Sequence, residues 1–239
     1  MTTYVLVHGA WGGAHGFRHV RRLLHAAGHE VFTPSLTGIG ERAHLTGPQV
    51  GLTTHVLDVV NTVLYEDLDP IVLVGYSYGG VVVTGTLDHI GARVAHLVFV
   101  DAFVPHDGES VIGLVGGPPP GPVTIGQDWL VPSTPRDYDD PDEAAFADAR
   151  RSPQPLRCFT EPVHLGRPLE AFPFTRTYVK ATADRPDAPG AGVFWAAADR
   201  ARQSPAWHYR EIATNHMIPS NRPDELAALL LELTADADA

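Results

Sequence analysis

The chain has 239 residues, 44% of them hydrophobic and 19% charged, which is the composition of a globular protein long enough to bury one full core. Its formal net charge of -11 argues against a nucleic-acid partner and against docking on anionic lipid, because both select concentrated Lys and Arg. The single cysteine, Cys158, allows no internal disulfide and fits a cytoplasmic location.

The first predicted strand begins almost at the first residue. The opening letters MTTYVLVHG contain no basic region, and their apolar run is too short for a signal peptide or a membrane anchor. We therefore expect an intracellular protein that does not contact a membrane.

Apolar segments and helical patterns alternate over the first part of the chain. Strands are predicted at residues 4–7, 30–33, 71–75 and 94–100, and helices at 18–28, at 53–64 and from the third strand to residue 90. Strands that are apolar on both faces and separated by helices are typical of a parallel sheet covered on two sides.

The alternation stops between residues 103 and 173. This stretch is rich in proline and polar residues, as in GGPPPGPV and VPSTPRDYDDPDE, and has one short helical pattern at 142–151. So long a stretch without strands inside a compact domain is usually a functional lid or cap.

The alternation then returns, with strands predicted at 176–181 and 208–212 and helices at 193–203 and 223–234. The sequence therefore predicts one α/β domain with a mostly parallel sheet flanked by helices. Residues 1–102 and 174–239 form its predicted core, and residues 103–173 an inserted cap.

One serine follows directly on the third strand, in IVLVGYSYGGVVV. The letters from Gly75 to Gly79 match G-x-S-x-G between a predicted strand and a predicted helix, which is the context of a nucleophile elbow. The sharp turn strains the backbone of Ser77 and exposes its hydroxyl, and glycine on either side avoids collision with the neighbouring strand and helix. A serine that only caps the helix is the alternative, and the two glycines favour the nucleophile.

A serine nucleophile needs a base, and the chain order in this kind of site is serine, acid, histidine. Among 13 histidines, His216 lies a few residues beyond the last predicted strand and just before the last helix, which makes it the predicted base. His15 and His19 could in principle share a metal ion, but no carboxylate or cysteine lies near them in the sequence, so no metal is expected.

An oxyanion hole needs two N–H groups directed at the developing negative charge. The elbow supplies the backbone N–H of Tyr78, and the glycine-rich loop after the first strand, VHGAWGG, is predicted to supply that of Ala10. The same loop superficially resembles a dinucleotide fingerprint. Its spacing is G-x-x-G-G-x-x-G, however, and no Asp or Glu ends the second strand, so no nicotinamide or other cofactor is expected.

These stretches resemble the α/β-hydrolases, and within them bacterial esterases related to plant methyl esterases and hydroxynitrile lyases. The resemblance runs through YVLVHGAWGG, AAGHEVFTPSLTGIGERAHL, GYSYGG, LVFVDAFVPHDGES and NHM. It implies a core of a sheet between two helical layers, a cap between two sheet strands and no cofactor. Hydroxynitrile lyases of this branch carry threonine at the position of Gly9 and lysine at that of Met217, so the resemblance favours an esterase.

The third member of the triad must be a carboxylate, and two candidates stay open. Asp184 follows a predicted strand at a position that resembles the acid of plant methyl esterases. Asp101 ends an earlier strand and resembles the acid position of some haloalkane dehalogenases. A carboxylate at the end of a buried strand is costly without a partner, whereas Asp184 lies in a Pro- and Gly-rich loop, so burial favours Asp101.

The predicted chemistry is ester hydrolysis through an acyl-enzyme, carried out by Ser77, His216 and the acid. We expect a small apolar or aromatic ester in a pocket lined by Trp11, Tyr76, Phe103, Trp129 and Met217. A biosynthetic cyclase or thioesterase, a lyase, or a small-molecule receptor with slow turnover could use the same residues. The sequence leaves the substrate and the oligomeric state open, a homodimer included.

Overall fold

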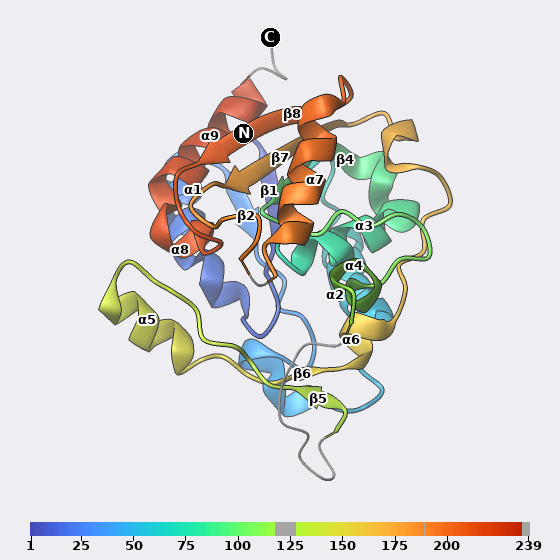
Figure 1. The fold of residues 1–239 in the computed structure, drawn as a ribbon. Helices are drawn as coiled ribbons and strands as arrows, with labels where there is room; N and C mark the ends of the chain where they lie inside the picture. Colours follow the sequence, from blue (N-terminus) through green and yellow to red (C-terminus); the bar gives the residue numbers. More distant parts are fainter. Residues whose placement is uncertain (118–127, 189, 236–239) are drawn as a thin grey trace.

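The computed structural model describes residues 1–117, 128–188 and 190–235. Within these residues a six-stranded sheet has the order β2-β1-β3-β4-β7-β8, and each neighbouring pair is parallel (Figure 1). Its strands are β1 Thr3–Val7, β2 Glu30–Phe32, β3 Ile71–Tyr76, β4 Val94–Val100, β7 Thr175–Ala181 and β8 His208–Ile212. The predicted α/β fold with a parallel central sheet is confirmed.

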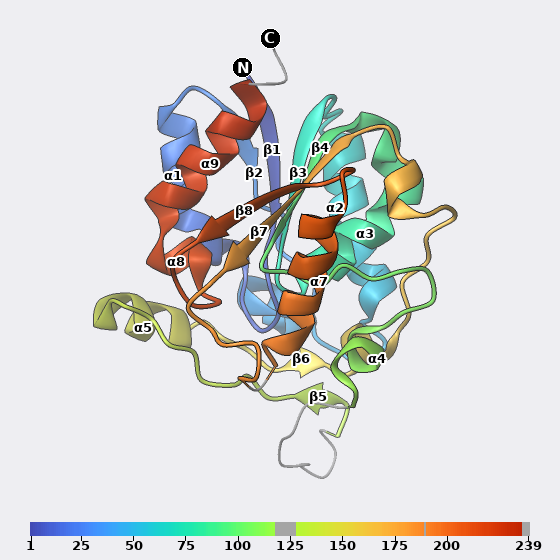
Figure 2. The same ribbon diagram turned by 45° about the horizontal axis from the view of Figure 1, so that its top comes forward.

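Helices cover both faces of the sheet because its inner strands are apolar on both faces (Figure 2). On β3, Val72 and Val74 pack toward one helical layer, whereas Ile71 and Leu73 pack toward the other. The first layer consists of α1 Arg18–Ala26 and α9 Pro223–Ala235. The second consists of α2 Leu52–Tyr65, α3 Gly79–Ile90 and α7 Gly192–Gln203.

The parallel strands bring several chemically reactive residues to one edge of the sheet. Ser77 follows β3, Asp101 follows β4, Asp184 lies beyond β7, and His216 lies beyond β8. The loop that contains Ala10 follows β1 at the same edge. This edge, at the carboxyl ends of the strands, is where open α/β sheets bind their ligands.

The prediction that residues 103–173 contain no strands is wrong. β5 Leu130–Val131 pairs antiparallel with β6 Gln154–Pro155, and the N–H of Leu156 donates to the carbonyl of Trp129 at 2.7 Å. Strands of 2 residues are too short to produce a hydrophobic alternation that the sequence could reveal. The segment also contains the short helices α4 Val111–Val115, α5 Pro141–Asp148 and α6 Arg157–Thr160.

These elements lie beyond the carboxyl ends of the strands, with α5 on one side and β5 and β6 below the sheet (Figure 2). Residues 118–127 of the predicted cap and residues 189 and 236–239 of the predicted core lie outside the described residues. Among the described residues, no helix combines the length and the apolar character needed to cross a membrane.

Buried histidines brace the core in their neutral form. His8 donates through Nδ1 to the Gly9 carbonyl and accepts at Nε2 from the Leu36 N–H at 3.1 Å. His55 contacts the Tyr78 hydroxyl at 2.9 Å, and His96 contacts the Thr177 hydroxyl at 2.8 Å. Burial lowers the pKa of His8, His55 and His96 to about 4.

We expect acid to destabilise this protein before its carboxylates titrate. The three buried imidazoles stay neutral in the folded state down to a pKa of about 4. Their unfolded-state pKa is about 6.5, so below that pH the unfolded state binds more protons. The free energy of unfolding should therefore fall as pH falls through this window, by roughly 1.4 kcal/mol per pH unit for each imidazole. Urea unfolding between about pH 7 and about pH 5 measures this slope.

The variant His96→Gln should lower the dependence of the unfolding free energy on pH by the contribution of one imidazole, roughly 1.4 kcal/mol per pH unit. His44→Gln, which removes an exposed imidazole, serves as the matched control. A free energy of unfolding that stays constant across the window would contradict the neutral assignment.

Candidate active site

Ser77 lies in a strained turn between β3 and α3. Its φ is 54°, in the left-handed region that residues with a Cβ rarely adopt. A Cβ on Gly75 would lie 2.8 Å from the Gly79 carbonyl oxygen, so glycine is required beside the turn. The N–H of Ser77 donates to the Val100 carbonyl at 3.2 Å, and the Ser77 carbonyl accepts from the Phe103 N–H at 3.2 Å. The residues around the end of β4 therefore hold the strained conformation.

His216 connects Ser77 to a carboxylate. Its Nε2 lies 2.9 Å from Ser77 Oγ, and its Nδ1 lies 2.6 Å from Asp101 Oδ2. Since an ionised carboxylate only accepts hydrogen bonds, Nδ1 donates to Asp101 and Nε2 is left to accept from the serine hydroxyl. The imidazole lies between the rings of Phe194 and Tyr76, with centroid distances of 4.7 and 5.1 Å, which fix its orientation.

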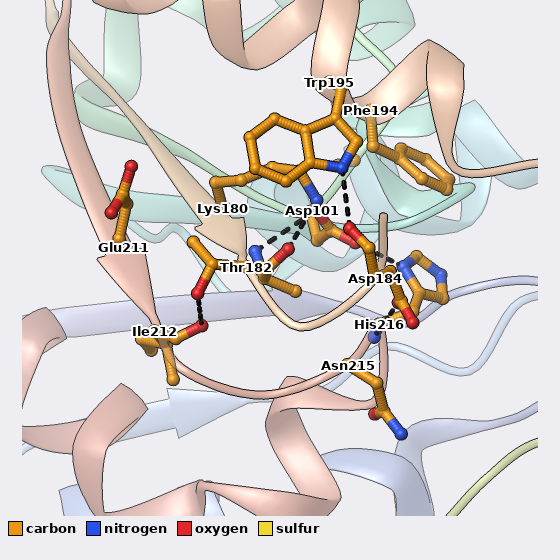
Figure 3. Close-up of polar contacts among 12 residues, drawn as sticks. Asp101, Lys180, Thr182, Asp184, Phe194, Trp195, Glu211, Ile212, Asn215 and His216 are labelled. Atoms are coloured by element: carbon orange, nitrogen blue, oxygen red, sulfur yellow. Dashed lines mark hydrogen bonds and ion pairs between the residues drawn. The ribbon is translucent and has the colours of Figure 1, made fainter. Parts of the chain in front are cut away.

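The two candidate acids contact different parts of His216 (Figure 3). Asp101 contacts the imidazole, whereas Asp184 Oδ2 accepts the backbone N–H of His216 at 2.7 Å. The Asp184 carbonyl in turn accepts from the Trp195 indole N–H at 2.8 Å. Asp101 is therefore placed to orient the ring, and Asp184 to hold the loop that carries it.

Lys180, which the sequence analysis missed, is the second partner of Asp101. Its Nζ lies 2.7 Å from Asp101 Oδ1, and the exposed fractions of the two side chains are 0% and 1%. The ammonium also donates to the Ala181 carbonyl at 2.6 Å and lies 4.5 Å from the centroid of the Trp195 ring. The available signal was a lysine within YVKA, the apolar end of the predicted strand, because lysine is rarely buried without a partner.

The carboxyl group of Asp101 is kept ionised by these neighbours. Burial by itself would raise its pKa, but the hydrogen bonds and charges of His216 and Lys180 outweigh burial and lower the pKa below its usual value. An ionised Asp101 can hold His216 in the tautomer that accepts a proton from Ser77, and can stabilise the cation that results.

The predicted oxyanion N–H groups of Ala10 and Tyr78 belong to the two loops beside Ser77. Neither donates a hydrogen bond to another residue in the part of the chain that the structure describes. The Ala10 loop is anchored by the next residue, Trp11, whose backbone N–H donates to Gln154 Oε1 at 2.9 Å and whose indole donates to the Val131 carbonyl at 3.0 Å. Strands β5 and β6 thus fix the loop that precedes the site.

A cleft that is open to solvent lies over Ser77 and His216. Tyr76 and Met217, two of the predicted pocket residues, line it. Trp11, Phe103 and Trp129 are not among the described residues that do so. Two of these side chains pack on other aromatic rings instead. The ring centroids of Phe103 and Phe194 are 5.0 Å apart, and those of Trp11 and Phe159 are 5.5 Å apart.

The cleft also contains polar and charged side chains that the sequence analysis did not predict. Its polar side chains include Arg136, Tyr138, Glu143 and Arg151, all from the segment 103–173. Proline and polar residues dominate that segment, so no hydrophobic periodicity in its sequence predicts which side chains face the cleft.

The described residues contain no group of three or more His, Cys, Asp or Glu side chains that could hold a metal ion. His15 and His19, considered together in the sequence, face different carboxylates. His15 lies 3.6 Å from Glu41, and His19 lies 3.4 Å from Glu143.

Sequence comparison places the chain among known proteins. The family model described as "Alpha/beta hydrolase family" matches residues 4–229. A carbendazim hydrolyzing esterase from Nocardioides sp. (strain SG-4G) is 49% identical over 115 residues, which are 48% of either chain. Methylesterase 8 of Arabidopsis thaliana is 35% identical over 43% of this chain and 38% of its own length. An alpha-hydroxynitrile lyase of the same plant is 32% identical over 43% of this chain and 40% of its own length.

These matches span about half or less of the length of each relative. Structural similarity covers nearly the whole chain. The methylesterase MES16 from Arabidopsis has a TM-score of 0.76 at 22% identity, covering 98% of this chain and 99% of its own. Tomato methylketone synthase I has a TM-score of 0.78 at 18% identity, covering 98% of both chains. At these identities the similarity shows a shared fold.

The two carboxylates should differ strongly in their effect on the reactivity of Ser77. We expect Asp101→Asn to slow labelling of Ser77 by a fluorophosphonate by about three orders of magnitude, because an amide no longer enforces the reactive tautomer of His216. We expect Asp184→Asn to slow it by less than about tenfold, because its amide oxygen can still accept the backbone N–H of His216. A mass-spectrometric time course measures both rates.

Asp101→Asn also leaves Lys180 buried without a counter-charge, which should cost about 3–5 kcal/mol of stability. The double variant Asp101→Asn/Lys180→Met removes that cation and separates reactivity from folding. Equal and mild losses in Asp101→Asn and Asp184→Asn would contradict the different roles assigned to them.

Proposed function

The chain belongs to the alpha/beta hydrolase family, and we propose that it is a serine carboxylesterase that hydrolyses a small-molecule ester through an acyl-enzyme. The observation that carries this proposal is the position of His216, within hydrogen-bonding distance of both Ser77 and Asp101. A serine hydroxyl alone is a weak nucleophile, and a base oriented by a carboxylate supplies what it lacks.

In the acylation half, Ser77 Oγ attacks the ester carbonyl while His216 Nε2 takes the hydroxyl proton. The N–H groups of Ala10 and Tyr78 bind the carbonyl oxygen as it becomes negative. Asp101 stabilises the positive charge on the imidazole. When the tetrahedral intermediate collapses, the bond to the alkoxy oxygen breaks, His216 returns its proton to that oxygen, and the alcohol leaves.

In the deacylation half, water takes the place of the alcohol. His216 removes a proton from the water, whose oxygen attacks the acyl carbon, and the same N–H groups bind the negative oxygen. The bond from the acyl carbon to Ser77 Oγ then breaks, and the proton passes from His216 to Oγ. The carboxylic acid leaves, and the starting state is restored with atoms and charge balanced.

The segment 103–173 acts as the cap in this proposal. Its residues Arg136, Tyr138, Glu143 and Arg151 line the cleft beside Ser77, while the sheet edge carries the reacting groups. Relatives named as a carbendazim hydrolyzing esterase and as methylesterases support a small ester as substrate. Tyr76 and Met217 offer it apolar surface close to the serine.

Cyanohydrin cleavage is the second candidate, because one relative is named as an alpha-hydroxynitrile lyase. Hydroxynitrile lyases of this branch carry threonine and lysine at two positions where this chain has Gly9 and Met217, and both differences favour hydrolysis. A Cβ at Gly9 would lie 3.1 Å from the Ser77 Cβ, so the glycine leaves room for a carbonyl beside the serine. Met217, where such lyases carry lysine, accepts at Sδ from the Tyr76 hydroxyl at 3.4 Å and supplies no cation.

Turnover of an activated aryl ester tests the proposal. Ser77→Ala and His216→Ala should each lower kcat by about four to six orders of magnitude, because nucleophile and base act as one unit. For the same reason the double variant should be little slower than either single variant. Release of the phenol from 4-nitrophenyl acetate measures kcat, and Ser204→Ala serves as a control for serine replacement.

A pre-steady-state burst of phenol with no burst in Ser77→Ala supports the acyl-enzyme. Tight binding of ester without appreciable turnover would instead indicate a receptor. Release of cyanide from a cyanohydrin faster than release of phenol from an ester would indicate a lyase.

A further inference from the structure

Two guanidinium groups line the same cleft as Ser77 and His216. Arg136 follows β5 in the chain, and Arg151 follows α5. Neither forms a salt bridge with a carboxylate of the described residues. A guanidinium brings a positive charge and planar N–H donors to a cleft. Two unpaired cations in one cleft are unexpected in a chain with a formal net charge of -11.

Arg151 is incompletely satisfied. Its Nε and Nη2 atoms are buried and have no hydrogen-bond partner among residues 1–117, 128–188 and 190–235. A buried donor without an acceptor destabilises the fold, and it does so more strongly when the group is charged. An acceptor from outside the chain would satisfy these atoms, and an anion would do so most strongly.

Arg136, which lines the same cleft as Arg151, packs on an aromatic ring. Its guanidinium is 5.5 Å from the centroid of the Trp11 ring, in the loop that also carries Ala10. Burial and the charge of Arg151 lower its pKa, while the neighbouring Tyr76, Tyr138 and Asp184 favour its charged form. Asp184 uses a carboxylate oxygen on the backbone N–H of His216 at 2.7 Å.

The remaining acid of the cleft has its own partners. Among the described lining residues, Glu143 is the one carboxylate, and both its oxygens accept from Arg18. His19 lies 3.4 Å from the same group. Glu143 is therefore occupied, and the charges of Arg136 and Arg151 are left for a ligand.

We propose that Arg136 and Arg151 form an anion subsite of the Ser77 cleft, and that the ester hydrolysed there carries a second group that is an ionised carboxylate. The inference rests on the proposed esterase function. A carboxylate fits because its two oxygens match the planar fork of a guanidinium, and because it supplies the acceptors that Arg151 lacks. The two arginines make the cleft prefer an anionic ester over a neutral one. Tyr76 and Met217 carry no charge and cannot produce this preference.

Matched esters test the proposal, each pair differing only in a carboxylate or its uncharged amide. 4-Nitrophenyl hydrogen adipate and 4-nitrophenyl adipamate carry the difference in the acyl part. 4-Carboxyphenyl acetate and 4-carbamoylphenyl acetate carry it in the alcohol part. After division by the uncatalysed rate of each ester, kcat/KM should favour the carboxylate by at least about tenfold in one pair, which identifies the part of the ester that faces the arginines.

Arginine variants show whether these residues cause the preference. Arg151→Gln and Arg136→Gln should each reduce the ratio of carboxylate to amide kcat/KM by about tenfold. Arg150→Gln is the matched control, since Arg150 is exposed and its guanidinium lies 3.7 Å from the centroid of the Phe146 ring. It should leave the ratio unchanged. Equal kcat/KM for carboxylate and amide in both pairs, or a preference that survives both Gln variants, overturns the subsite.

Failure of the subsite and failure of the esterase proposal give different results. If the neutral esters are hydrolysed through Ser77 without any charge preference, the esterase stands and the subsite is wrong. If no ester acylates Ser77, calorimetric titration with adipate and with adipamide still measures the subsite directly. Tighter binding of adipate than of adipamide, lost in Arg151→Gln, supports it, and equal binding overturns it.

Discussion

The buried carboxylate of Asp101 is the group on which the site depends. With 1% of its side chain exposed, it is stable as an anion only because Lys180 and His216 both contact it. Lys180 acts in two directions: it keeps Asp101 ionised, and it offsets part of the negative charge that His216 faces. Trp195 covers the lysine, and its indole also holds the loop of Asp184 (Figure 3). Lys180 on β7, Trp195 on α7 and the loop of Asp184 are therefore connected, one through the next, to the carboxylate of Asp101.

The sheet makes this arrangement possible by ending adjacent strands at one edge. Ser77 and Asp101 follow neighbouring strands, and both adopt a positive φ, of 54° and 40°. Hydrogen bonds to neighbouring strands stabilise these conformations: the N–H of Ser77 donates to the carbonyl of Val100, and the N–H of Asp101 donates to that of Val179. Strain at Ser77 and Asp101 is therefore supported by the most buried part of the core.

The core and the segment 103–173 contribute different properties to the cleft. The sheet edge carries Ser77, His216 and Asp101, whereas the segment contributes most of the charged side chains that a ligand would meet. The two parts meet at Trp11, whose backbone and indole both donate to residues of β5 and β6. In the proposed function, this junction couples the fit of the substrate to the position of the oxyanion loop.

The sequence by itself determined the alternating strands and helices, the strained turn at Ser77 and the position of His216. These follow from local patterns: hydrophobic periodicity, glycine beside a serine, and order along the chain. Only the tertiary structure decided which aspartate contacts the imidazole, that Lys180 is its partner, and that Arg136 and Arg151 face the cleft. Those contacts join residues distant in the sequence, with Asp101 and His216 separated by 115 positions, and no local pattern encodes them. They depend on which strands are neighbours and on how the segment 103–173 folds over the sheet edge, and both are properties of the assembled chain.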